Sequence, residues 1–143
     1  MATTAAITIS SDIGMGAGLS KTMTLTKAGA LTDIEETTGF SRRKLAATTA
    51  VDLITMANEL VEPSDNTAAK VYVQNIGDGK GTIDKSTYVT VSIGDTGGTT
   101  QQIGRLYGGD WLMMPVTVVD DMDVVVAPST NDAVVLEYTM FYE

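Results

Sequence analysis

Cysteine and histidine are both missing from this chain of 143 residues. Without cysteine the chain forms no disulfide, which agrees with a reducing compartment, and without histidine it lacks the most common general base and metal ligand. Ser-His-Asp catalysis, Cys-His catalysis and zinc sites built from thiolate or imidazole are therefore excluded within it. We expect no enzyme activity, no cofactor and no catalytic residue.

Basic residues are scarce: 9 Lys and Arg face 18 Asp and Glu, which gives a net charge of -9. A chain of this charge repels phosphate backbones, so we expect no direct contact with nucleic acid. Long apolar runs are also missing, and residues 1–7 contain neither the basic nor the apolar part of a signal peptide. The sequence therefore predicts no membrane segment and no secretory leader.

Period-two alternation is what the chain has in abundance. From Lys70 to Glu143, apolar and polar residues alternate in short runs that are separated by Gly, Asp and Asn turns. In the last run, one face holds Val134, Leu136, Tyr138 and Met140. The other face holds Val135, Glu137, Thr139 and Phe141. This pattern predicts strands with one buried face.

The spacing of these runs predicts the fold class. We expect strands over 5–10, 22–26, 50–56, 70–76, 87–93, 103–107, 111–118, 122–127 and 133–143. Strands at near-regular spacing, with no helices between them, indicate an all-β sandwich or barrel rather than a parallel α/β sheet. Pro115 predicts an edge position or a bulge for its strand.

The first forty residues differ from the rest, because they contain few core-forming residues and a Gly-rich stretch at 14–18. We interpret 1–40 as an extended N-terminal arm or edge hairpin and 41–143 as the sandwich domain. The alternative is that 1–40 supplies the first strands of the sandwich.

Residues 49–62 are ambiguous. Leu53, Met56, Ala57 and Leu60 follow helical spacing, whereas Val51, Leu53 and Thr55 alternate as in a strand. Because the β-branched residues there favour a strand, we predict a strand over 50–56, followed by a loop through Asn66.

The ligand-binding motifs that the sequence resembles are all incomplete. A P-loop fails over 14–22, because Ser20 and Met15 stand where glycines are required. A calcium loop around 78–84 loses three ligand positions, so we predict a hairpin connection there instead. Asp120, Asp121 and Asp123 are predicted to form a solvated acidic turn, with a cation site as the alternative.

Four runs carry a resemblance to a known group of proteins: Lys-Val-Tyr-Val-Gln-Asn at 70–75, Tyr-Val-Thr-Val-Ser-Ile-Gly at 88–94, the Gly-Gly-Asp-Trp region at 103–115, and the strand at 133–143. The series resembles small virion structural proteins of tailed bacteriophages, especially marine and cyanobacterial phages. The resemblance covers about half of the chain, and its motifs are structural rather than catalytic.

The resemblance implies a jelly-roll-like β-sandwich that serves as a subunit of a capsid or tail, and head decoration (cement) proteins belong to this group. It also implies a location in the virion, or in the host cytoplasm during assembly. The implied partners are copies of the chain itself, the major capsid protein or other virion proteins, and a tail or fibre subunit is an alternative of the same kind.

We expect the contacts with these partners to use three parts of the surface. They are the arm at 22–26 with Thr22 and Leu25, the basic trio Arg42, Arg43 and Lys44, and the strand edge with Trp111, Met113 and Pro115. The basic trio lies in a run that is otherwise interpreted as a solvated loop.

Two hypotheses from other classes make different predictions. A carbohydrate-binding sandwich requires coplanar exposed aromatic rings, with Trp111 at the rim. A glycosidase requires a deep cleft with two carboxylates, drawn from Asp110, Asp120 or Glu137.

Overall fold

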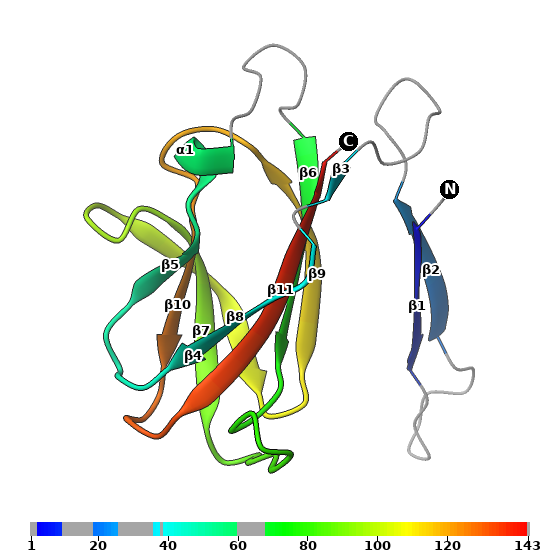
Figure 1. The fold of residues 1–143 in the computed structure, drawn as a ribbon. Coiled ribbons are helices and arrows are strands. Elements are labelled where there is room, and N and C mark those ends of the chain that lie inside the picture. The colour runs from blue at the N-terminus through cyan, green and yellow to red at the C-terminus, as the bar shows by residue number, and fades with distance from the viewer. Residues whose placement is uncertain (1–2, 10–18, 26–35, 38, 60–67, 143) are drawn as a thin grey trace.

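The structure is a computed structural model, and it describes residues 3–9, 19–25, 36–37, 39–59 and 68–142. These residues form the elements β1 (Thr3–Ile9), β2 (Leu19–Leu25), β3 (Glu36–Thr37), β4 (Ser41–Leu45), β5 (Val51–Ile54), α1 (Met56–Glu59), β6 (Ala68–Asn75), β7 (Tyr88–Gly94), β8 (Thr100–Tyr107), β9 (Trp111–Thr117), β10 (Val124–Pro128) and β11 (Val134–Tyr142). Figure 1 shows their arrangement.

Two antiparallel sheets face each other and make a β-sandwich (Figure 1). One sheet has the order β5-β10-β7-β8, and the other has β3 and β4 along one side of β11, followed by β6 and β9. Taking β4 to β11 as eight strands, this order is that of a jelly roll. The prediction of an all-β, jelly-roll-like sandwich is therefore confirmed.

The alternation in β11 produces the core as the sequence predicts. Leu136 and Met140 are fully buried between the sheets, and Val134 and Tyr138 belong to the same apolar cluster. On the opposite face Val135 is buried as well, because the turn at Gly79 lies against its side chain. Sequence alternation alone does not predict that a turn covers Val135 on this face.

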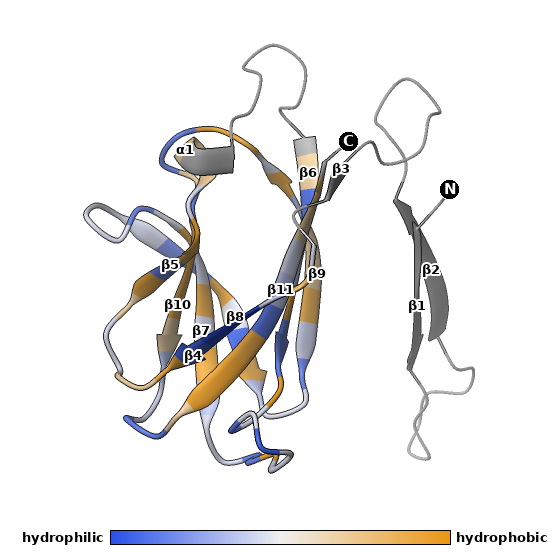
Figure 2. Cartoon of the chain, in the orientation of Figure 1, coloured by the Kyte–Doolittle hydropathy of each residue, from blue (hydrophilic) through white to orange (hydrophobic). Residues whose placement is uncertain are grey.

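Buried residues from both sheets share one apolar cluster. Its fully or nearly fully buried members include Val71, Val73, Val89, Val91, Val118, Val124 and Val126. Figure 2 shows hydrophobic and hydrophilic positions interleaved along the sandwich strands, whereas β4 is hydrophilic over most of its length. Valine dominates because its branched side chain packs well on a pleated surface.

Asn75 is a buried polar residue, 1% exposed, that joins the end of β6 to the other sheet. Its Nδ2 donates to the main-chain oxygen of Leu106 in β8 at 3.0 Å, and its Oδ1 accepts from the Gly77 N–H at 2.9 Å. Its own main chain bonds with Asp110 and Gly109 in the β8–β9 turn. One side chain thus fixes the β6 end, the following turn and an opposing strand.

The ambiguous region after residue 49 contains both kinds of structure. Val51–Ile54 is a strand, but α1 forms one helical turn over Met56–Glu59, so the predicted strand is wrong at Met56 and the predicted loop is wrong at 57–59. The Met56 N–H donates to Asp123 Oδ1 at 2.7 Å, so a carboxylate from the β9–β10 loop caps this turn. Asp123 lies 67 positions after Met56, so the sequence around Met56 contains no sign of this capping residue.

Other sequence predictions need correction. The segment after Asn75 is not a hairpin connection, because β6 and β7 lie in different sheets. The run 41–44 is not a solvated loop, because it forms most of β4, paired with β11. The strand predicted at 103–107 begins earlier, at Thr100.

The proposed arm contains a hairpin, since β1 and β2 pair with each other in a two-stranded sheet of their own. β3 already pairs with β11, so the sandwich sheet begins at Glu36, before the predicted boundary at residue 40. The Gly-rich stretch at 14–18 lies outside the described residues.

Replacing Asp123 by asparagine is expected to stabilise the protein at neutral pH. Burial raises the pKa of the Asp123 carboxyl above 3.8. The hydrogen bond from the Met56 N–H lowers this pKa, and the negative charges of Asp52, Asp95 and Asp120 raise it, so that the net shift is upward. Because the folded state holds this proton more tightly than the unfolded chain, stability is lost as pH rises from 3.8 through the raised pKa. Asparagine keeps an acceptor for the Met56 N–H without the charge.

Thermal unfolding at a series of pH values measures this effect. The asparagine variant should melt at a higher temperature than the parent at neutral pH, and the difference should shrink below pH 3.8. Asp123→Ala is the matched control, and it should cost about 1 to 3 kcal/mol because a buried N–H loses its partner. An asparagine variant that is less stable at neutral pH would contradict the argument.

Candidate docking surface

The outer face of the sheet formed by β4, β11, β6 and β9 brings together side chains from four strands. Tyr72 on β6 stands between Met113 on β9 and Thr139 on β11. The adjacent row runs through Gln74, with its neighbours Trp111, Glu137 and, beyond Glu137, Arg42. We call this set, together with Phe40, Lys44, Pro115 and Phe141, the outer face.

Three aromatic rings lie in a row across the outer face. The ring centroids of Phe40 and Tyr72 are 5.9 Å apart at an interplanar angle of 79°. Those of Tyr72 and Trp111 are 6.3 Å apart at 34°. Phe40 is 68% exposed and Trp111 is 40% exposed, so large apolar surface faces the solvent at both ends of the row.

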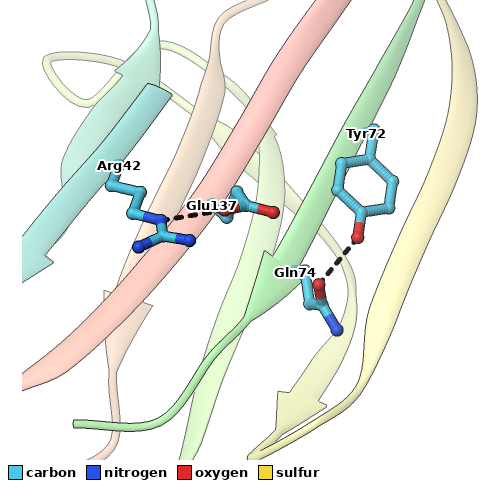
Figure 3. Close-up of polar contacts among 4 residues, drawn as sticks. All are labelled: Arg42, Tyr72, Gln74 and Glu137. Atoms are coloured by element: carbon cyan, nitrogen blue, oxygen red, sulfur yellow. Dashed lines mark hydrogen bonds and ion pairs between the residues drawn. The ribbon is translucent and has the colours of Figure 1, made fainter. Parts of the chain in front are cut away.

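Polar groups in the row beside Tyr72 bind one another. The Tyr72 hydroxyl donates to Gln74 Oε1 at 2.8 Å, and Arg42 Nε donates to Glu137 Oε2 at 2.8 Å (Figure 3). Burial, and then the charge of Glu137, raise the pKa of the Tyr72 hydroxyl above 10.0, so it remains a donor. A partner covering this face would therefore leave these groups satisfied.

Five of the predicted contact residues meet on the outer face. Arg42 and Lys44 are exposed on β4, and Trp111, Met113 and Pro115 lie on β9, which is an edge strand as Pro115 predicts. Sequence reasoning missed Phe40, Tyr72 and Phe141. The alternation in β6 places Tyr72 opposite the core, but only the strand order places it beside Trp111.

Arg43 does not belong with them. It points to the inner side of β4, where its guanidinium donates to the main-chain oxygen of Asp52 in β5. Arg43 therefore ties the two sheets together along one side of the sandwich. Thr22 and Leu25 lie in β2, outside the sandwich sheets, and their part in a contact stays a prediction.

A second apolar feature opens on the other side of the sandwich, where β8 and β9 are the edge strands. A pocket of about 420 Å³ lies there, between the two sheets. We call it the edge pocket, and its apolar lining includes Ile93, Ile103, Met114, Pro115, Val116 and Met122. Ile103 is the extra residue of a bulge in β8, opposite Val91 and Ser92, and is 51% exposed.

The three aspartates of the β9–β10 loop do not share one environment. Asp123 is turned inward to cap α1, while Asp120 and Asp121 are exposed. Across the part of the chain that the structure describes, no group of three His, Cys, Asp or Glu residues could hold a metal ion. In the same part, no helix has the length and apolarity needed to cross a membrane.

Comparison with known proteins adds little to this geometry. No family model matches the chain, and no curated protein matches it. Among solved structures, a chain of the Bacillus endospore appendages, described as disulfide-linked pili, is 20% identical, with coverage of 72% of this chain and 85% of that one and a TM-score of 0.42. The Yersinia pseudotuberculosis-derived mitogen is 8% identical, with coverage of 76% and 86% and a TM-score of 0.44. We draw no function from either likeness.

Proposed function

We propose that this chain is a non-enzymatic virion subunit, a capsid decoration protein that binds copies of itself and the major capsid protein. The virion assignment rests on the sequence resemblance to small structural proteins of tailed phages. The docking role rests on the outer face, where exposed aromatic rings lie beside polar groups that bind one another. A decoration subunit acts in the virion after assembly in the host cytoplasm.

The composition of the outer face supports docking to a protein. Aromatic residues, methionine and arginine are enriched at protein–protein interfaces, and the face presents Phe40, Tyr72, Trp111, Met113 and Arg42. Its rigid position on a four-stranded region of sheet lowers the ordering cost of binding. Four of the eight aromatic residues of the chain lie on this one face, and their concentration there is the observation that carries the proposal.

Trp111→Ala is expected to weaken binding to shells assembled from the major capsid protein of the same virus. A buried aromatic anchor contributes about 2 kcal/mol or more, so we expect roughly a thirty-fold rise in Kd. Co-sedimentation with shells measures it.

The matched control is Tyr107→Ala. Tyr107 is 38% exposed, nearly the same as Trp111, but it lies on β8 in the other sheet, packed on Tyr88. Its removal should leave shell binding unchanged. Equal loss of binding in both variants would contradict a specific role for the outer face, and a parent protein that stays in the supernatant would contradict the decoration role. Binding to purified tails instead of shells would identify a tail subunit.

A carbohydrate-binding module is the competing function, and the aromatic row is the observation that favours it. Flat stacking of sugar rings needs coplanar aromatic faces, whereas Phe40 stands at 79° to Tyr72. The geometry is therefore better suited to the irregular surface of a protein. Glycan-array binding that Trp111→Ala abolishes would reverse this preference.

A further inference from the structure

The two ends of the sandwich both present exposed apolar side chains. Val119 and Met122 lie in the β9–β10 loop, at the end near α1. Ile83 and Tyr107 lie at the other end, next to the β8–β9 turn. Figure 1 shows the β9–β10 loop and the β6–β7 connection at opposite ends of the sandwich. These four side chains therefore form two separate apolar surfaces, and both lie away from the outer face.

At the first end, residues 119–122 form a tight turn that carries two carboxylates. The Met122 N–H donates to the main-chain oxygen of Val119 at 3.3 Å, so Asp120 and Asp121 occupy the central positions of a β-turn. Both aspartates are exposed, and neither carboxylate has a hydrogen bond or an ion pair with any other described residue. We call residues 119–122 the acidic tip, in which two apolar residues flank two negative charges.

The opposite end contains a hollow of about 380 Å³, which we call the end hollow. Its lining combines apolar, basic and acidic side chains with the glycines of the β8–β9 turn: Ile83, Lys85, Tyr107, Gly108, Gly109 and Asp110. A Cβ at Gly108 would lie 2.3 Å from the main-chain oxygen of Asp84, so glycine lets this turn pack closely against the β6–β7 connection. The end hollow is thus built where two segments from different parts of the chain meet.

Two basic side chains at this end have no carboxylate partner among the described residues: Lys85 lines the end hollow, and Arg105 lies on the adjacent strand β8. The Arg105 guanidinium lies 4.5 Å from the centroid of the Tyr88 ring, so stacking holds it while its N–H groups stay available for a carboxylate. The nearby carboxylates of Asp84 and Asp110 accept main-chain N–H groups in their own turns. The end hollow is therefore suited to an apolar segment that brings its own negative charge.

We propose that the acidic tip of one copy docks in the end hollow of a second copy. The apolar residues of the tip cover those of the hollow, and its two aspartates approach Lys85 and Arg105. This inference deepens the proposed self-association of a decoration subunit and rests on it. Because tip and hollow lie at opposite ends of one subunit, the contact is heterologous, and it repeats from copy to copy as a row or a closed ring.

Cysteine pairs test this contact, because the chain has no cysteine of its own. Chains with Val119→Cys are mixed with chains carrying Ile83→Cys, and disulfide formation under mild oxidation is followed on a non-reducing gel. Ile103→Cys replaces Ile83→Cys in the matched control, since Ile83 is 50% and Ile103 51% exposed, but Ile103 lies outside the end hollow. We expect several-fold more heterodimer with Ile83→Cys, because a disulfide needs Cα atoms within about 7 Å.

Charge reversal gives a second measurement, by sedimentation equilibrium of the isolated chain. Lys85→Glu should raise the Kd of self-association by about ten-fold, because it places a carboxylate opposite the two aspartates of the tip. Lys80→Glu is the matched control, since Lys80 is an exposed residue of the same connection that does not line the end hollow. Mixing Lys85→Glu chains with Asp120→Lys chains should restore association, because every contact between the two variants then joins opposite charges.

Three results would overturn the inference. They are equal crosslinking from Ile83→Cys and Ile103→Cys, no crosslinking of Ile83→Cys to Val119→Cys, and equal self-association of Lys85→Glu and Lys80→Glu. All these positions are exposed, so the variants should fold, and circular dichroism checks that they do.

Failure of this contact is separable from failure of the decoration role. Co-sedimentation with shells far below saturation, where bound copies have no neighbours, depends on the outer face alone. A protein that binds shells without crosslinking through Ile83→Cys would keep the decoration role and lose the contact between tip and hollow. A protein that crosslinks but stays in the supernatant would keep the contact and lose the decoration role.

Discussion

Replacing Asn75 by alanine should lower the free energy of unfolding by about 2 to 6 kcal/mol, because two buried groups each lose a partner at about 1 to 3 kcal/mol. The groups that would lose their hydrogen-bond partner are the main-chain oxygen of Leu106 and the N–H of Gly77. Water cannot easily replace the side chain, since Asn75 is 1% exposed. The loss should appear in urea unfolding as a lower midpoint with an unchanged slope.

Two further variants divide this effect. Asn75→Asp keeps the acceptor for Gly77 but loses the donor to Leu106 and adds a buried charge, so it should also destabilise. Asn131→Ala is the control, because Asn131 makes a single exposed bond at 3.3 Å to the Thr48 N–H, and it should change stability by about 0.5 kcal/mol or less. If Asn75→Ala matched this control, Asn75 would not be the link between the sheets.

Leu136→Ala is expected to destabilise the fold by about 2 to 5 kcal/mol. Leu136 is fully buried on β11, which pairs with β4 on one side and β6 on the other, so little backbone movement can fill the cavity. Chemical denaturation with tryptophan fluorescence measures the loss, since Trp111 is the one tryptophan of the chain.

Ile103→Ala provides the comparison for this core substitution. It removes a branched apolar side chain from a half-exposed bulge, and it should alter stability by about 0.5 kcal/mol or less. If Leu136→Ala lowered the free energy of unfolding by less than about 1 kcal/mol, the surrounding side chains would have to close the cavity, which contradicts the tight packing around β11. A large loss from Ile103→Ala would assign the edge pocket to the core.

The fold class was predictable because period-two alternation is a local property, and each strand carries it independently. β11 is the clearest case, since Leu136 and Met140 occupy the core as their spacing predicts. Pro115 also gave the right edge position for β9. The helical turn at Met56 was missed because its capping carboxylate, Asp123, arrives from a distant loop.

The candidate docking surface was only half predictable. Arg42 could be selected from its basic run and Trp111 from the strand edge that Pro115 indicates, but their common face depends on β6 and β11 lying between them. Arg43 was predicted to make contacts beside Arg42, but it points inward to Asp52, because adjacent positions in a strand face opposite sides. Strand order is set by long-range pairing, and a single sequence does not show it.

The position of β11 has a consequence for synthesis on the ribosome. This strand is made after every other strand of the sandwich, yet it is the shared neighbour of β3, β4 and β6. A nascent chain therefore carries β4 and β6 with open hydrogen-bonding edges until translation reaches β11. Productive folding of this sheet has to wait for that moment, and a polypeptide cut short before Val134 would be left with exposed edges prone to aggregation.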